Sequence, residues 1–470
     1  MERVAFLPFE NLSGDPALDW VSSSGVRIVI DELLGGTAHT IPLQVGALRD
    51  AYGSGATKLV HGYVEKRRQG LHFEFVVEDA ATHKTLETVT NDGDALPSLD
   101  RLAKQIDTGA HAFSSTNPQA VAAWASGDYE KAVSLDPGFG AAWSSWVQAR
   151  NAAGDKQQAT DIAARALQQS NLQTPVDRAQ LEFVSATLRQ DQPAQDRALK
   201  ALAQLMPHDV ALLSQLATRE TNARHFSEAA RYYEAILQEA PENTDAWNQM
   251  GYAQALGGDL ESAEKSFERY GRDPAHIANA LDSRGEAEFM NGKFAAAEKS
   301  FLDAHAKSSA MLAGGDLLKA AYAHWLQGDL PGADKLFFQY LAFRTEQKDV
   351  LVPWRQAVWE YSTGRRDAAI ARVSGITGAA ANVAAAQLAL WKDPSKLPQD
   401  PVALKQAYQQ TPPAADGVAR VLYAAALAKT GQKDEARKLL ALWPLPGLDS
   451  DPLLQSFVFP KYLELKQELK

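Results

Sequence analysis

The sequence contains no cysteine among its 470 residues. Disulfide bonds, thiolate nucleophiles and zinc sites built on cysteine are therefore excluded. The ten histidines are scattered along the chain, and none forms a pair with the spacing of metal ligands. We therefore predict no metal site, while the lack of cysteine leaves the compartment open.

Long apolar runs and an excess of basic charge are also lacking. The most apolar stretch, from Gly375 to Trp391, is shorter than the roughly 20 residues that a membrane-spanning helix needs. The 47 basic and 58 acidic side chains give a formal net charge of -11, which repels nucleic acid. We therefore expect a soluble chain that neither inserts directly into a membrane nor binds nucleic acid.

Motifs for nucleotide binding and catalysis are missing as well. No phosphate-binding loop ending in Gly-Lys-Ser/Thr occurs, and no G-x-G-x-x-G motif follows an expected strand. The run Ser22-Ser23-Ser24 falls on an expected helix, without the sharp turn that exposes a nucleophilic serine. We therefore predict that the chain is not an enzyme, and we assign it no catalytic residue, metal ligand or cofactor.

What the sequence does contain is a repeat of 34 residues. Small and aromatic residues recur at this interval at Ala217, Gly251 and Gly285, at Ala229, Ala263 and Ala297, and at Tyr233, Phe267 and Phe301. The small residues let two helices approach closely, and the aromatic residues fill the space between neighbouring helix pairs. The spacing therefore predicts helix-turn-helix units that begin near Val210, Thr244 and Ala278.

These spacings resemble the tetratricopeptide repeat (TPR) family, whose large, small and aromatic positions match Trp247, Gly251, Ala263 and Phe267. The resemblance is specific over residues 210–301 and implies a right-handed superhelix, an α-solenoid. A turn pattern, in which alanine lies five positions after glycine, extends the array at Gly127, Gly154, Gly328, Gly364 and Gly431. We expect about nine helix pairs, a degenerate unit within residues 378–412, and a C-terminal capping helix within residues 451–470.

The first 115 residues have a different pattern. Apolar alternation predicts strands at residues 4–9, 38–42, 58–66, 71–78 and 85–90, and helices at 16–34, 45–52 and 96–113. The predicted fold class is therefore α+β. A small N-terminal α/β domain, residues 1–115, precedes an all-α repeat array, residues 116–470.

The segment VAFLPFENLSGDP at residues 4–16, with LVHGYV at residues 59–64, resembles the N-terminal domain of TolB-like proteins found ahead of TPR arrays. This resemblance covers about a quarter of the chain and implies a bacterial protein with a sensory or signalling role. The chain is cytoplasmic if it is complete, and periplasmic or extracytoplasmic if it is part of a membrane-anchored parent. The resemblance favours the second compartment.

The TPR resemblance also implies a site for a partner. In that family the first helix of each repeat lines the concave face, with the residues one, four and eight positions after the repeat start pointing into it. The candidate partner-binding residues are Ser214, Thr218, Asp245, Asn248, Tyr252, Asn279, Asp282 and Glu286. Their polar, mildly acidic character predicts a neutral to basic peptide or protein partner, although a solvated surface is the alternative.

We therefore predict a non-enzymatic interaction scaffold, or a regulatory module, that binds a peptide or protein through the concave face of the array. Two alternatives stay open. The chain is a purely architectural or dimerising part of a larger membrane-linked signalling protein, or its N-terminal domain binds a nucleotide or catalyses hydrolysis. The sequence does not determine the oligomeric state.

Overall fold

The computed structural model describes residues 2–34, 40–53, 55–172, 174–310, 313–445 and 452–470. The chain divides into two compact units, Met1–Leu216 and Ala217–Lys470. The division falls within helix α10 (Val210–Asn222), inside the predicted repeat array. The change from strands to helix pairs occurs earlier, within the first unit.

The first unit opens with a mixed sheet of strand order β3-β1-β4-β5-β6. Its strands are β1 (Arg3–Phe6), β2 (Glu10–Asn11), β3 (Ile41–Gln44), β4 (Lys58–Arg67), β5 (Gly70–Asp79) and β6 (Thr85–Asp92). β1 pairs in parallel with β3 and β4, whereas β4, β5 and β6 form antiparallel hairpins. The predicted alternation of β5 is confirmed, because Phe73, Phe75 and Val77 are all buried.

The sheet contains one strand that was not predicted. Glu10 and Asn11 lie just beyond the predicted first strand, residues 4–9, and form β2, which pairs in parallel with Tyr63 and Val64 of β4. Residues 38 and 39, the start of the predicted second strand, lie outside the described residues.

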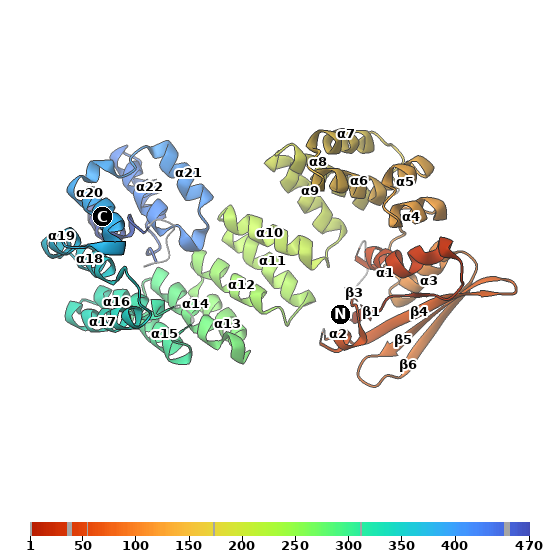
Figure 1. The fold of residues 1–470 in the computed structure, drawn as a ribbon, viewed down its shortest axis with the longest axis horizontal. Helices are drawn as coiled ribbons and strands as arrows, with labels where there is room; N and C mark the ends of the chain where they lie inside the picture. The colour runs from red at the N-terminus through yellow and green to blue at the C-terminus, as the bar shows by residue number, and fades with distance from the viewer. Residues whose placement is uncertain (1, 35–39, 54, 173, 311–312, 446–451) are drawn as a thin grey trace. The chain divides into compact units, whose positions relative to one another are not determined.

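Helices α1 (Asp19–Leu34) and α3 (Ala95–Ile106) lie side by side across the sheet, while the short α2 (Leu48–Gly53) follows β3 (Figure 1). Asp15 caps the 3-10 turn η1 (Pro16–Leu18) ahead of α1 by accepting a 2.9 Å hydrogen bond from the Ala17 amide. α3 ends at Ile106 rather than at the predicted residue 113. The Asp107 carboxylate accepts a 2.8 Å hydrogen bond from the Gly109 amide, a local turn that competes with helix continuation.

From α4 onward the described residues form helix-turn-helix pairs. These are α4 (Pro118–Ala125) with α5 (Tyr129–Leu135), α6 (Gly140–Ala152) with α7 (Lys156–Leu167), α8 (Pro175–Leu188) with α9 (Gln192–Leu205), α10 with α11 (Phe226–Glu239), α12 (Thr244–Leu256) with α13 (Leu260–Tyr270), α14 (Ile277–Met290) with α15 (Phe294–Lys307), α16 (Gly315–Leu326) with α17 (Leu330–Glu346), α18 (Val352–Ser362) with α19 (Arg366–Ser374), and α22 (Gly417–Lys429) with α23 (Lys433–Leu439). The degenerate unit is the pair α20 (Ala381–Lys392) and α21 (Pro401–Gln410), and α24 (Gln455–Glu468) follows α23. The helix starts predicted from the 34-residue spacing are confirmed to within one residue.

The small positions of the repeat are small for a steric reason. A Cβ atom at Gly251 would lie 2.6 Å from Cε1 of Phe267, and one at Gly285 would lie 2.7 Å from Cδ1 of Phe301. The helices of α12–α13 and α14–α15 therefore approach closely enough to exclude any side chain at these two positions.

The pair α8–α9 went unrecognised in the sequence. The turns of most other pairs contain a glycine with positive φ, such as Gly258 with φ of 88°. In the α8–α9 turn this conformation belongs to Gln190, with φ of 57°, and in the α10–α11 turn to Arg224, with φ of 63°. A search for glycine in the turn therefore misses this helix pair.

No single helix of the described residues is long and apolar enough to cross a membrane. Two consecutive helical segments reach the length and apolar composition of a membrane-spanning helix only when they are counted together. These are Arg366–Ser374 and Gly378–Lys392, and the chain bends by 118° between them.

Candidate functional site

The candidate site lies in the second unit, where the C-terminal helix α24 packs against the first helices of earlier repeats. We call the surface formed by Leu318 and Tyr322 of α16 and by Trp354 and Val358 of α18 the inner groove. α24 contacts α18 and α22, and near its C-terminal end the Arg437 side chain of α23 donates a 2.7 Å hydrogen bond to the Leu469 carbonyl.

The first turns of α24 are enclosed on every side. Four consecutive residues from Ser456 to Phe459 are buried, with exposed fractions of 8% or less. A helix that lies on a protein surface buries only one of its faces, whereas a helix that is buried on every face is surrounded by other elements. In its second half α24 becomes amphipathic, and Tyr462 and Leu465 pack with α22 and α23. The predicted C-terminal helix therefore covers the last helix pair and also enters the inner groove.

Aromatic rings hold α24 in the groove. Phe459 stacks on Tyr322, with ring centroids 4.7 Å apart and an interplanar angle of 20°. The same ring meets Trp325 edge-on at 6.0 Å and Phe289 at 6.2 Å. One side chain of α24 thus contacts two different repeats. Such aromatic pairs contribute about 0.5–1.5 kcal/mol each beyond the burial of their surface.

Directed hydrogen bonds fix the position of α24 along the groove. The Ser456 hydroxyl accepts a 2.9 Å hydrogen bond from the Trp391 indole, and the Gln387 amide donates a 2.9 Å hydrogen bond to the Leu453 carbonyl. Gln387 is itself fully buried. Because a buried polar group that loses its partner is costly, these bonds favour one position of the helix.

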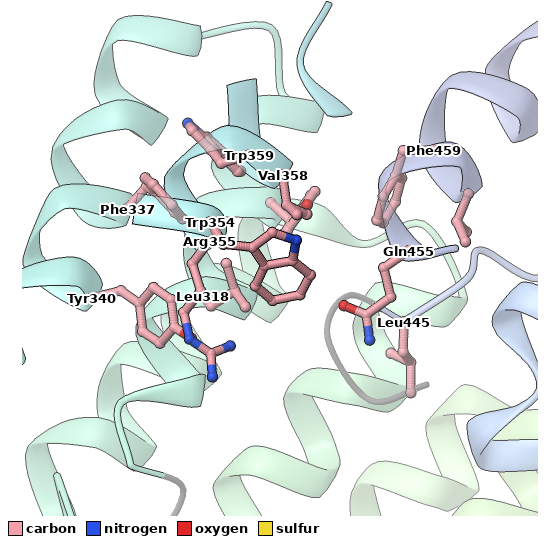
Figure 2. A pocket seen from close by; sticks show the side chains of 12 residues that line it. Leu318, Phe337, Tyr340, Trp354, Arg355, Val358, Trp359, Leu445, Gln455 and Phe459 are labelled. Carbon is pink, nitrogen blue, oxygen red and sulfur yellow. The ribbon is translucent and has the colours of Figure 1, made fainter. Parts of the chain in front are cut away.

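A narrow cavity of about 40 Å³ remains between the inner groove and the C-terminal segment. Figure 2 shows Leu445, Gln455 and Phe459 facing Trp354, Val358 and Trp359 across this cavity. The Trp359 indole donates a 2.7 Å hydrogen bond to Asp334, which also pairs with Arg365 at 2.7 Å. The wall opposite α24 is thus apolar and rigidly held, which suits it to receive apolar side chains from a helix.

Next to the inner groove lies a group of polar side chains that we call the polar ladder. It is formed by Tyr252 of α12, Asp282 and Glu286 of α14, and Lys319 of α16. The Lys319 ammonium donates to Asp282 at 2.7 and 2.8 Å and to Glu286 at 2.6 Å. The Tyr252 hydroxyl donates to the other Glu286 oxygen at 2.7 Å. The ladder therefore links the first helices of three successive repeats.

Burial and the neighbouring charges shift the pKa values of the groups in the polar ladder. Burial raises the pKa of Asp282 to about 6, although Lys319 opposes this rise. Burial also raises the pKa values of Glu286 and of Asp316, a fully buried carboxyl group near Asp282. Burial by itself lowers the pKa of Lys319, but Glu286 and Asp282 raise that pKa above its usual value. Two buried carboxylates thus share one ammonium, and the charge of that ammonium also opposes the rise in the pKa of Asp316.

The predicted partner-binding residues fall into two groups. Asp282 and Glu286 are buried and paired with Lys319, and Tyr252 donates a hydrogen bond to Glu286. Thr218 and Asp245 are exposed, and Asn248, Ser214 and Asn279 are half-buried. Of this second group, Ser214 donates to the Val210 carbonyl within its own helix, and Asn279 donates to the Tyr270 hydroxyl at 3.0 Å.

Asn248 stands apart from the other half-buried residues of this set. Its Oδ1 atom is buried and accepts no hydrogen bond from the described residues. It is therefore a buried acceptor that no donor of the described residues satisfies.

The aromatic part of the site was missed because the repeat lengthens. From Gly292 to Gly328 to Gly364 the step is 36 residues rather than 34. Carried forward with this step, the inward positions four and eight residues after the repeat start become Leu318 and Tyr322, then Trp354 and Val358. The signal was present in the sequence, but only the regular units at residues 210–301 were used to assign the site.

Comparisons with known proteins add little to this description. No family model and no curated protein matches the chain. Among solved structures, the chain is similar to one described as "Structure of Naa15/Naa10 bound to HypK-THB", at 16% sequence identity and a TM-score of 0.39. The match covers 75% of this chain and 57% of that chain, so this chain spans little more than half the length of its structural neighbour. At that level of similarity the match identifies no function.

Proposed function

We propose that this chain is a non-enzymatic interaction scaffold whose inner groove binds an amphipathic helix of a protein partner. The observation that supports this proposal is the insertion of α24, whose Phe459 stacks at 4.7 Å on Tyr322. Recognition of a helix in a groove uses the same elements, with apolar side chains entering an apolar surface. In this chain α24 acts as an internal ligand, and a partner helix takes its place.

The partner is selected by its apolar face rather than by its charge. A neutral to basic partner was expected because the predicted lining is mildly acidic, but Lys319 pairs with two of the acidic residues, Asp282 and Glu286. The exposed carboxylate of Asp245 is left to contact a partner, with Thr218 and Asn248 as further polar contacts. A neutral helix therefore suits the groove as well as a basic one does.

The first unit gives the scaffold its context. The resemblance of residues 4–16 and 59–64 to TolB-like domains supports a regulatory or signalling role in a bacterial protein. In this proposal the sheet connects the scaffold to the rest of a signalling protein, and the groove of the second unit binds the partner.

A binding titration tests the groove. A fluorescent peptide of residues 452–470 is titrated with the full-length chain and with its Phe459→Ala variant, and the anisotropy of the peptide is measured. We expect saturable binding that is tighter to the variant, because its own α24 competes less well for the groove. Phe-to-Ala truncations in packed sites cost about 3–5 kcal/mol, so the same peptide carrying Phe459→Ala should bind at least about tenfold more weakly.

Val402→Ala is the matched control, because Val402 lies on α21 and is 75% exposed. This variant should bind the peptide as the unaltered chain does. Equal affinity for the two peptides, or binding that does not saturate, would contradict the proposed function.

A further inference from the structure

A second cavity, of about 310 Å³, lies in the second unit on the other side of α24. Its walls come from α22, from α24, and from the connection between α20 and α21 that contains Pro394 and Pro398. It shares no lining residue with the cavity of the inner groove. Its volume is at the lower end of the range for small-molecule pockets, about 300–1,000 Å³.

The interior of this cavity is apolar. Leu404 and Leu422 are buried beside it, and Phe457 of α24 forms part of its wall. The side chains at the base of α22 are small, at Ala425 and Ala426. An apolar chain or ring bound here would replace water against these surfaces, which is favourable in proportion to the area covered.

The rim of the cavity is positively charged. Three cations line it, Arg366 at the start of α19, Lys429 at the end of α22 and Lys461 of α24, together with one carboxylate, Glu464 of α24. Lys461 pairs with Glu464 at 2.9 Å. Arg366 lies 5.4 Å from the centre of the Tyr361 ring, and neither Arg366 nor Lys429 forms an ion pair with a carboxylate of the described residues. Two cations thus remain available to an anionic group at the mouth of an apolar cavity.

We propose that this cavity binds an amphipathic monocarboxylate, with the alkyl or aromatic body against Leu404, Leu422 and Phe457 and the carboxylate between Arg366 and Lys429. The guanidinium of Arg366 presents paired donors that match a carboxylate, and Lys429 adds a point charge. An amine of the same length meets like charge at the rim, and an alcohol of the same length gains only the apolar contacts. The site goes beyond the proposed scaffold function and exists only while α24 is in place, because Phe457 and Lys461 of α24 line it.

Calorimetric titration of the full chain with octanoate, octanol and octylamine tests the site. Octanoate should bind at one site, and octylamine should show no saturable binding. Octanol should bind at least about tenfold more weakly than octanoate, because a hydrogen bond to a charged group contributes at least as much free energy as a tenfold change in affinity requires. Arg366→Gln and Lys429→Gln should each weaken octanoate binding about tenfold, whereas octanol binding should not change.

Two further variants separate binding from folding. Ala426→Leu fills the cavity and should abolish binding of octanoate and octanol alike, with an unfolding transition that stays cooperative. Lys433→Gln on α23 removes an exposed charge that does not line the cavity and should leave octanoate binding unchanged. The proposal is overturned if octylamine binds as well as octanoate, if the Gln variants bind octanoate normally, or if no saturable heat of binding is observed.

Discussion

At the scale of single residues, Lys319 decides whether the buried carboxylates of Asp282 and Glu286 are tolerated. It is 2% exposed and bonds to both Asp282 and Glu286. A buried ion pair contributes little net stability, but removing one partner leaves a buried charge without compensation. The ladder is therefore a point at which one substitution has a large effect.

We predict that Lys319→Met lowers the free energy of unfolding by about 3–5 kcal/mol at pH 7. The loss of stability should be smaller at pH 5 than at pH 7. The pKa of Asp282 is already near 6, and without the Lys319 cation this carboxyl group takes up a proton and no longer leaves a buried charge unpaired. Urea unfolding at both pH values measures this change. Lys265→Met is the control, since Lys265 is 69% exposed and pairs with Glu261 at the surface. A deficit equal at the two pH values would contradict the assigned role.

A second residue-scale prediction concerns Glu32 of α1, which is 1% exposed and has one buried oxygen without a hydrogen-bond partner in the described residues. Burial raises the pKa of Glu32 to about 9, whereas its value in the unfolded chain is near 4.5. The folded state therefore retains a proton that the unfolded state loses. The resulting stability is complete below pH 4.5 and declines by about 1.4 kcal/mol per pH unit until about pH 9.

Glu32→Gln removes this dependence, so the variant should be more stable than the unaltered chain at pH 9, and this advantage should diminish toward pH 5. Chemical unfolding across this range measures the difference. Glu130→Gln, at an exposed position on α5, should follow the unaltered chain at every pH. A difference for Glu32→Gln that does not change with pH would show that Glu32 is ionised in the folded state.

At the scale of elements, the turn between α10 and α11 is joined to the segment from α21 to α22. The Arg224 guanidinium donates to the Tyr408 carbonyl at 2.6 Å, stacks on the Tyr408 ring at 3.9 Å, and pairs with Asp416 at 3.1 Å. This contact connects residues 184 positions apart in the chain. The first helix pair of the second unit is thereby tied to the helices that support α24.

We predict that Arg224→Lys lowers the stability of the second unit by about 1–3 kcal/mol. A lysine keeps the charge but cannot stack and bond in several directions at once. Amide exchange in α21 and α22 should become faster in the variant. Arg231→Lys, whose exposed side chain pairs with Glu228, should leave exchange unchanged. Unaltered exchange in Arg224→Lys would show that this contact does not hold the elements together.

At the scale of the whole molecule, the sequence predicts the helix pairs because their signals are local. The spacing from Gly251 to Phe267 records a steric contact within one pair, and Gly258 records a turn conformation that glycine favours. The pairs whose turns contain Gln190 or Arg224 do not follow that rule. Sequence reasoning therefore succeeds where a contact lies within about 34 residues.

The site was less predictable because its contacts join distant segments. Phe459 meets Tyr322 across 137 residues, and no pattern near either residue indicates this contact. Residues 451–470 predict an amphipathic helix, but the burial of Ser456 to Phe459 on all sides depends on the shape of the groove that receives them. Lys319 was overlooked because it lies outside the regular repeats at residues 210–301, although its partners Asp282 and Glu286 were both selected.

The central claim, that the inner groove holds α24 as an exchangeable helix, is tested most directly by hydrogen exchange on the unaltered full-length chain. Amide exchange in residues 455–468 is measured with and without an excess of the peptide of residues 452–470. We predict that the peptide accelerates exchange in the α24 of the chain, whereas the Phe459→Ala peptide does not. Exchange in α24 that is unaffected by either peptide, or accelerated equally by both, would contradict this account.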